Sequence, residues 1–140
     1  MKITSFLFGL VFAVAVICVL LLTFGVSFRG SGPVKYNAAT ETKLTGTIEQ
    51  VDDFACPVND GEIGSHIRVR TSAGIVQVHL APARIMRAHD IKFSPGEKVE
   101  VVGSKVHYKG SEDIIAREIT RGTDFYVFRD QGGKLVLVQY

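Results

Sequence analysis

The sequence is poor in cysteine, and its two cysteines cannot build a disulfide framework. Cys18 lies in a long hydrophobic segment, whereas Cys56 lies in the polar sequence downstream. Small secreted domains that depend on disulfides carry several cysteines, so this class is excluded. No basic residue stands beside Cys56 to lower its pKa, which predicts an unreactive thiol.

A net positive charge is also missing from the chain after residue 40. The whole chain carries 16 basic and 14 acidic residues, but Lys2, Arg29 and Lys35 all precede residue 41. This leaves 13 basic against 14 acidic residues in 41–140. Proteins that follow phosphate backbones normally carry a positive excess, because neutralising phosphates dominates their affinity. A nucleic-acid partner is therefore disfavoured.

Motifs of catalysis and of metal binding are absent from the sequence. It contains no nucleophile elbow, no phosphate-binding glycine loop and no helical metal motif. The four histidines, His66, His79, His89 and His107, lack the close paired spacing of a structural zinc site. We therefore predict that the protein is not an enzyme, and we expect neither a metal site nor a cofactor.

One long hydrophobic run is present at the start of the chain. Residues 6–22 are 17 consecutive uncharged, mostly apolar residues, and no charge follows before Arg29. About 20 helical residues span the hydrocarbon core of a bilayer. We therefore predict a transmembrane anchor or uncleaved signal at 1–28. A flexible spacer rich in small and polar residues follows at 29–42, and a folded domain occupies 43–140.

Two other interpretations of this hydrophobic segment stay open. A cleaved secretory signal usually has a shorter core, and here only residues 25–27 offer a small-residue cleavage site. A lipoprotein signal needs small residues before Cys18, where Val16 and Ile17 stand. The signal-like position favours a domain facing the periplasm or cell exterior, although the flanking positive charges are nearly balanced. The predicted location is the bacterial cytoplasmic membrane.

Alternating apolar and polar residues predict a β-rich domain after the spacer. The expected elements are strands at 43–51, 66–71 and 75–80, a helix at 82–90, strands at 98–106 and 113–120, and a hairpin of 124–129 with 134–139. Gly46 predicts a bend in the first strand, and Gly103 a bulge in the fourth. Residues 52–64 are expected to form a long loop.

The second and third strands are predicted to form a hairpin with Ala73-Gly74 as its two-residue turn. In that register Arg68 lies opposite His79, and Arg70 lies opposite Gln77. The apolar residues of both strands then share one face, so the pairing is consistent with one buried side.

The segments GTIEQV, VQVHLAPA, SPGEKVEVVGSKV, IIAREI and FRDQGGKL resemble those of small exported or membrane-anchored bacterial OB-fold proteins of unassigned function. The resemblance covers roughly residues 43–137. It implies an all-β domain with a small α contribution: a five-stranded OB-fold-like barrel with a short helix between strands 3 and 4 and a C-terminal hairpin. With the N-terminal transmembrane helix, this is the predicted fold class. The motifs specify architecture and carry over no activity.

The predicted ligand-binding face lies on the exposed side of the second and third strands and on the loop after the fourth strand. Its residues are His66, Arg68, Arg70, Gln77, His79, Tyr108 and Lys109. A polar, partly cationic face with one aromatic residue suits an anionic oligosaccharide, a peptide carboxylate or a nucleic-acid strand. The alternative is that alternating polar residues only solvate an exposed strand face.

These observations predict a membrane-anchored, non-catalytic binding or accessory protein of the bacterial cell envelope. Its expected partners are the membrane and an envelope protein or oligosaccharide. Two alternatives stay open: a single-stranded nucleic-acid binder and a periplasmic metal or haem handling protein. The haem chaperone of cytochrome c maturation uses a histidine after its OB-fold barrel, and residues 121–140 contain no histidine, which disfavours a haem carrier.

Overall fold

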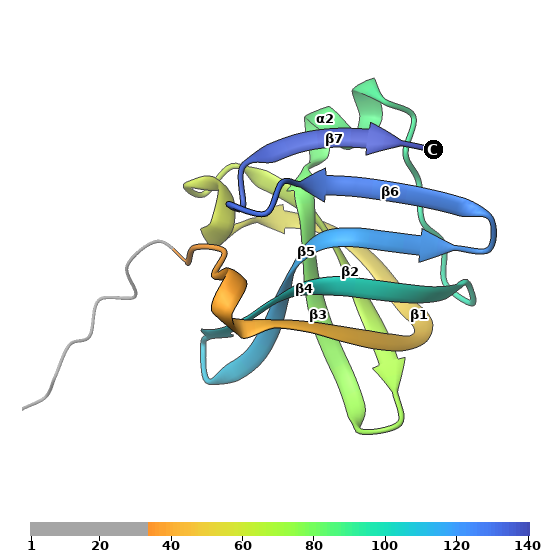
Figure 1. Ribbon diagram of the computed structural model, residues 1–140, viewed down its shortest axis with the longest axis horizontal. Helices are drawn as coiled ribbons and strands as arrows, with labels where there is room; N and C mark the ends of the chain where they lie inside the picture. Colours follow the sequence, from red (N-terminus) through yellow and green to blue (C-terminus); the bar gives the residue numbers. More distant parts are fainter. Residues whose placement is uncertain (1–33) are drawn as a thin grey trace, which may run out of the picture. The chain divides into compact units, whose positions relative to one another are not determined.

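A computed structural model describes residues 34–140, and the predicted anchor at 1–28 lies outside them, as do the first residues of the spacer. None of the helices in 34–140 is long and apolar enough to cross a membrane. The described chain is a seven-stranded sheet with one short α-helix and two 3₁₀ turns (Figure 1). The elements are η1 (Ala38–Thr40), β1 (Glu41–Ala55), η2 (Pro57–Asn59), β2 (Ile63–Thr71), β3 (Gly74–Pro82), α2 (Ala83–Ala88), β4 (Lys98–Tyr108), β5 (Ser111–Arg121), β6 (Asp124–Arg129) and β7 (Leu135–Gln139).

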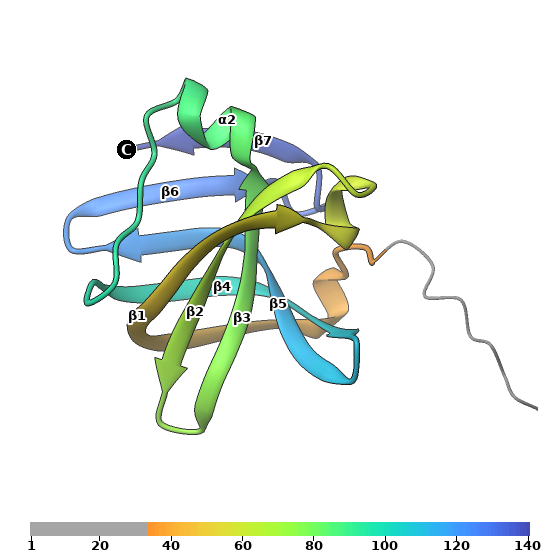
Figure 2. The same cartoon turned by 180° about the vertical axis from the view of Figure 1, so that it is seen from behind.

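Five of the strands close into a ring. β1 pairs antiparallel with β2 and with β4, β2 pairs with β3, and β4 pairs with β5. A short parallel pairing, Val78 with Ile114 and His79 with Ile115, joins β3 to β5 and closes the ring (Figures 1 and 2). A closed ring of five strands with a helix between β3 and β4 is an OB-fold-like barrel. The predicted barrel is confirmed for the described residues.

The first strand bends at Gly46, where it passes from one neighbour to the other. Residues Glu41 to Thr47 pair with β4, and residues Thr47 to Ala55 pair with β2. A Cβ atom at Gly46 would lie 2.2 Å from the carbonyl oxygen of Arg70. Only glycine lets the two backbones approach this closely, so the predicted bend has a steric cause.

The barrel interior is filled by alternate strand residues, and α2 covers one end. Ile67, Val69, Val78, Val101 and Ile119 are each fully buried. The helix lies at the end of the barrel opposite the β2–β3 turn (Figures 1 and 2) and buries Ala83 and Met86. It is shorter than the predicted 82–90, because Pro82 is its N-cap and His89 its C-cap.

The hairpin register predicted for the second and third strands is wrong by two residues. Arg68 pairs with Gln77 rather than with His79, and Arg70 pairs with Ile75. The turn is Ser72-Ala73, because the Thr71 hydroxyl accepts a hydrogen bond from the Ala73 amide and donates one to the Gly74 carbonyl, which closes the turn one residue earlier. A two-residue shift keeps every side chain on its face, so the alternation pattern could not reveal the error.

Other boundaries changed as well. β1 continues to Ala55, so the predicted loop 52–64 shrinks to residues 56–62. The predicted irregularity at Gly103 is confirmed by a register shift between Val102 and Gly103. β6 and β7 form the predicted C-terminal hairpin and extend the sheet beyond β5. The Asp130 carboxylate accepts hydrogen bonds from the Gly132 and Lys134 amides in the intervening turn.

Candidate metal centre

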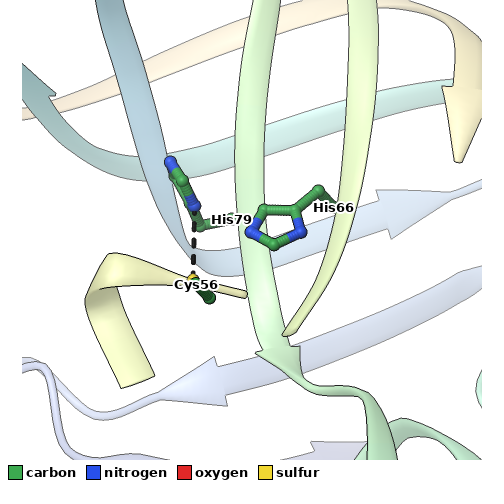
Figure 3. A group of neighbouring side chains, drawn as sticks. All are labelled: Cys56, His66 and His79. Atoms are coloured by element: carbon green, nitrogen blue, oxygen red, sulfur yellow. Dashed lines mark hydrogen bonds between the residues drawn. The ribbon is translucent and has the colours of Figure 1, made fainter. Parts of the chain in front are cut away.

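Three side chains with metal-ligating atoms meet beside the paired strands β2 and β3. The ligand atoms of Cys56, His66 and His79 all lie within 4.8 Å of one another, and all three residues are buried. Figure 3 shows them converging from three segments: β2, β3 and the link between β1 and η2. A thiol and two imidazoles gathered in this way form a ligand set for a transition-metal ion.

Backbone pairing explains why these three residues meet. His66 and His79 lie directly opposite each other across β2 and β3. Cys56 follows the last residue of β1 and is held by its own backbone: its amide donates to the Glu62 carbonyl at 2.9 Å, and its carbonyl accepts from the Gly61 amide at 3.0 Å. A Cβ atom at Gly64 would lie 2.8 Å from the Cys56 Cβ, so glycine is needed for Cys56 to lie against β2.

The closure of the barrel places a carboxylate behind His79. Asp113, at 3% exposure, directly precedes the two residues of β5 that pair with β3, and its Oδ2 lies 2.9 Å from His79 Nε2. The other oxygen accepts a hydrogen bond from the Ser111 hydroxyl. With Nε2–H donating to Asp113, the lone pair of Nδ1 points at Cys56 Sγ, 3.4 Å away. This carboxylate–histidine pairing is the usual support of a metal-ligating imidazole.

His66 is fully buried, yet it has no hydrogen-bond partner within residues 34–140. By distance and angle neither Nδ1 nor Nε2 makes a hydrogen bond, although the Asp52 and Gly64 backbones lie near enough to oppose the lowering of its pKa. One face of the ring stacks on Phe54, with centroids 3.6 Å apart, and the ring meets His79 edge-on at 4.8 Å. Leaving a buried polar group without a partner costs free energy, so such a group in a folded protein requires an explanation. A metal ion bound to one of its nitrogens supplies one.

Burial keeps all three ligands neutral at neutral pH. It lowers the pKa of His66 to about 4, and the neighbouring His79 adds to this effect. Burial also lowers the pKa of His79, although Asp113 acts in the opposite direction. It raises the pKa of the Cys56 thiol more than the nearby Val58 and Asn59 amides lower it. A metal ion would therefore have to displace the thiol proton, while both imidazoles are ready to coordinate.

The low pKa of His66 predicts acid sensitivity of the metal-free protein. Because the pKa lies below the ordinary value of 6.5, the unfolded chain binds more protons than the folded chain between these two values. Stability should be fully present above about pH 6.5 and fall by roughly 1–3 kcal/mol toward pH 4. Urea unfolding at several pH values measures this loss. His66→Gln should reduce the pH dependence, with His79 contributing what is left, whereas His89→Gln, at an exposed histidine, should leave it unchanged.

The face predicted from the sequence is divided by the structure. Its predicted exposure is wrong for His66 and His79, which are 0% and 1% exposed because Phe54 and the Cys56 turn cover them. Arg68 and Arg70 are exposed as expected, and the Arg70 guanidinium pairs with Glu49. Ligand binding by this arginine-bearing surface stays a prediction.

Four of the predicted residues do come together around one hollow beside the metal-ligand cluster. Gln77, His79, Tyr108 and Lys109 line a pocket of about 250 Å³, together with Phe54, Ser111 and Asp113. The Lys109 ammonium lies 5.2 Å from the centre of the Tyr108 ring. The pocket reaches the cluster at His79, whereas Cys56 is not among its lining residues.

Sequence reasoning missed Cys56 and Asp113 as parts of one site. Cys56 was expected to be an unreactive thiol, and Asp113 only a strand residue. The available signal was the hairpin register: a Ser72-Ala73 turn places His66 opposite His79, whereas the predicted register separated them. The approach of Asp113 depends on the parallel β3–β5 pairing, which no local pattern encodes.

The fold and this cluster define a small OB-fold-like barrel with a buried thiol–imidazole site. The chain belongs to the MamS/MamX magnetosome protein family, whose profile matches residues 40–126. The sequence predicted a location in the bacterial cell envelope, and membership of this family implies association with the magnetosome membrane. A search of curated proteins gave no match. A chain of the S. pombe Stn1–Ten1 complex is similar in structure, with a TM-score of 0.47 and 16% identity over 66% of this chain and 72% of that chain.

Proposed function

We propose that this chain is a non-catalytic accessory protein that binds a transition-metal ion at Cys56, His66 and His79. The observation that carries the proposal is the convergence of three buried ligand atoms within 4.8 Å, with His66 lacking any partner in residues 34–140. Asp113 behind His79 supplies the orienting contact that metal-bound histidines use. The geometry thus favours metal handling over the expectation, drawn from sequence spacing, that the protein has no metal site.

The donor set selects the kind of metal. A thiolate with two imidazoles suits Zn²⁺ and copper, whereas Mg²⁺ and Ca²⁺ prefer oxygen ligands. Three protein ligands leave one position of a tetrahedral ion open, as in sites that exchange a ligand. Haem fits this ligand set less well than a single ion does, because all three ligand atoms lie within 4.8 Å of one another.

A catalytic thiol is the second function that the same atoms suggest. Cys56, His79 and Asp113 lie in the order nucleophile, base and orienting carboxylate, with contacts of 3.4 and 2.9 Å. The thiol is only 1% exposed, and burial raises its pKa, whereas a nucleophilic cysteine needs an accessible thiolate. An ion can reach a buried thiol that an acyl substrate cannot, so we favour the binding role.

The proposed setting is a membrane-anchored barrel at the magnetosome membrane. Residues 1–28 are its anchor, and the barrel lies on the non-cytoplasmic side. Family membership and the hydrophobic run at residues 6–22 support this proposal. The arginine-bearing surface at Arg68 and Arg70 is the proposed contact for an envelope protein or oligosaccharide partner, since it stays exposed in the folded barrel.

Metal titration of the full-length chain in detergent micelles tests the metal site. After treatment with a chelator, Co²⁺ should bind at one ion per chain and give a thiolate-to-cobalt charge-transfer band, because Cys56 is among the ligands. Zn²⁺ should displace it and abolish the colour. His66→Ala should weaken binding more than about 100-fold, whereas His107→Ala, at an exposed histidine of β4, should not. Absence of the charge-transfer band in the wild-type chain would refute the proposal.

A further inference from the structure

A second pocket, of about 430 Å³, lies where the start of the described chain meets η2 and the β6–β7 turn. Its walls include Lys35, Tyr36, Asn59, Arg129 and Lys134. None of its lining residues belongs to the Cys56 cluster, although Arg129 lies near enough to Cys56 and His79 to lower the pKa of both. Its volume lies in the range of about 300–1,000 Å³ that is typical of small-molecule sites.

Arg129 is the buried polar group of this pocket. The residue ends β6 and is only 4% exposed. Its Nη1 donates to the carbonyl oxygens of Leu80 and Ala116, at 2.6 Å each, which fixes the guanidinium. Within residues 34–140, its Nε and Nη2 groups donate no hydrogen bond and no carboxylate forms an ion pair with it. Two of its nitrogens are therefore left without a protein partner.

The guanidinium stays charged at neutral pH, although burial lowers its pKa to about 10. Burying a cation without a counter-charge is unfavourable, and such charges are normally paired. Neutral carbonyl oxygens supply only part of the compensation. An anion bound in the pocket would supply the rest.

The pocket walls add positive charge and no acid. Lys35 and Lys134 are exposed at its rim, and its lining residues include neither Asp nor Glu. The neighbouring Asp130 carboxylate is engaged by the Gly132 and Lys134 amides. Glu41 is occupied by the Tyr36 hydroxyl and by Arg117. The nearby carboxylates thus have other partners. The guanidinium of Arg129 is therefore free to bind an anion from solution.

We propose that this pocket binds the oxyanion of a small molecule, a carboxylate or a phosphate, with Arg129 as its anchor and Lys35 and Lys134 as flanking cations. The free Nε and Nη2 of one guanidinium offer two parallel donors, the arrangement that planar oxyanions accept. The pocket is larger than inorganic phosphate alone requires, so the expected ligand carries its anionic group on a small organic body.

Isothermal titration of the full-length chain in detergent micelles, with chelator present, tests this proposal independently of any metal. The probes are inorganic phosphate and malonate, which represent the phosphate and carboxylate sources. We expect saturable binding of at least one probe at millimolar concentration, weakened by added chloride salt. The probe that binds more tightly identifies the source, and absence of saturable binding of both probes would overturn the proposal.

Two variants locate the anion. Arg129→Lys keeps the charge but loses the paired donors, and should weaken binding by about tenfold or more. Lys134→Glu puts an acid at the rim of the pocket and should weaken anion binding several-fold. Because Lys134 is exposed, this variant should fold, and it tests the location of the anion even if Arg129→Lys does not fold. Lys98→Glu, at an exposed lysine of β4 outside the pocket, is the matched control. Equal binding by wild type and Lys134→Glu would overturn the assignment.

Discussion

Replacing Cys56 by serine should abolish the thiolate-to-cobalt band and weaken metal affinity by more than about 100-fold. A hydroxyl has nearly the shape of a thiol, but it does not ionise at neutral pH and is a poor ligand for Zn²⁺ or copper. Loss of a supporting residue alone typically costs 10–100-fold, so loss of a ligand should exceed this. The band in the near-ultraviolet and the cobalt dissociation constant measure the effect.

The chain provides its own control for this experiment. Cys18→Ser makes the same chemical change in the hydrophobic segment, outside the described residues. It should leave both the band and the dissociation constant unchanged, because the proposed ligands all lie in the barrel. Loss of the band in Cys18→Ser, or its persistence in Cys56→Ser, would contradict the proposed site.

Replacing Gly46 by alanine should destabilise the barrel by about 3 kcal/mol or more. The new methyl group would lie 2.2 Å from the Arg70 carbonyl oxygen and 2.6 Å from a Val69 methyl group. A backbone oxygen cannot move aside without breaking the β1–β2 pairing, so the clash displaces a strand rather than a side chain. Urea unfolding of the full-length protein in detergent micelles, followed by far-ultraviolet circular dichroism, measures the loss.

Gly132→Ala is the matched control for this substitution. Gly132 is exposed in the β6–β7 turn, and the nearest atom to an added methyl group would be an Asp130 oxygen at 3.4 Å, an ordinary contact. Its effect on the free energy of unfolding should stay within about 0.5 kcal/mol. Similar stabilities of the Gly46→Ala and Gly132→Ala variants would show that β1 does not pass close to the Arg70 backbone.

Much of the architecture follows from local sequence. Alternation of apolar and polar residues located the strands, because a strand with one buried face repeats every two residues. Pro82 marked the start of the helix, Gly46 the place where β1 passes close to the Arg70 backbone, and Gly103 the register shift in β4. The hairpin register was the exception, since a shift of two residues leaves the same alternation.

The alternation pattern predicted the candidate site much less well than it predicted the strands. Polar residues on alternating positions were expected to face solvent, and this holds for Arg68. It fails for His66 and His79, which are covered by Phe54 and by the Cys56 turn at the end of β1. An imidazole is apolar enough to pack and polar enough to point outward, so its residue type does not decide its burial.

The sequence by itself determined the strands, the helix between β3 and β4, the near-neutral barrel and the hydrophobic N-terminal segment, because each depends on neighbours within a few residues. Tertiary structure decided which chemical groups meet. Cys56 reaches His66 and His79 because β1 continues along β2 to Ala55, and Asp113 reaches His79 because β3 pairs with β5. Arg129 is buried because β6 ends beside the Leu80 and Ala116 carbonyls. These contacts join residues 10 to 49 positions apart, and only the pairing and packing of the strands in the folded barrel bring such residues together.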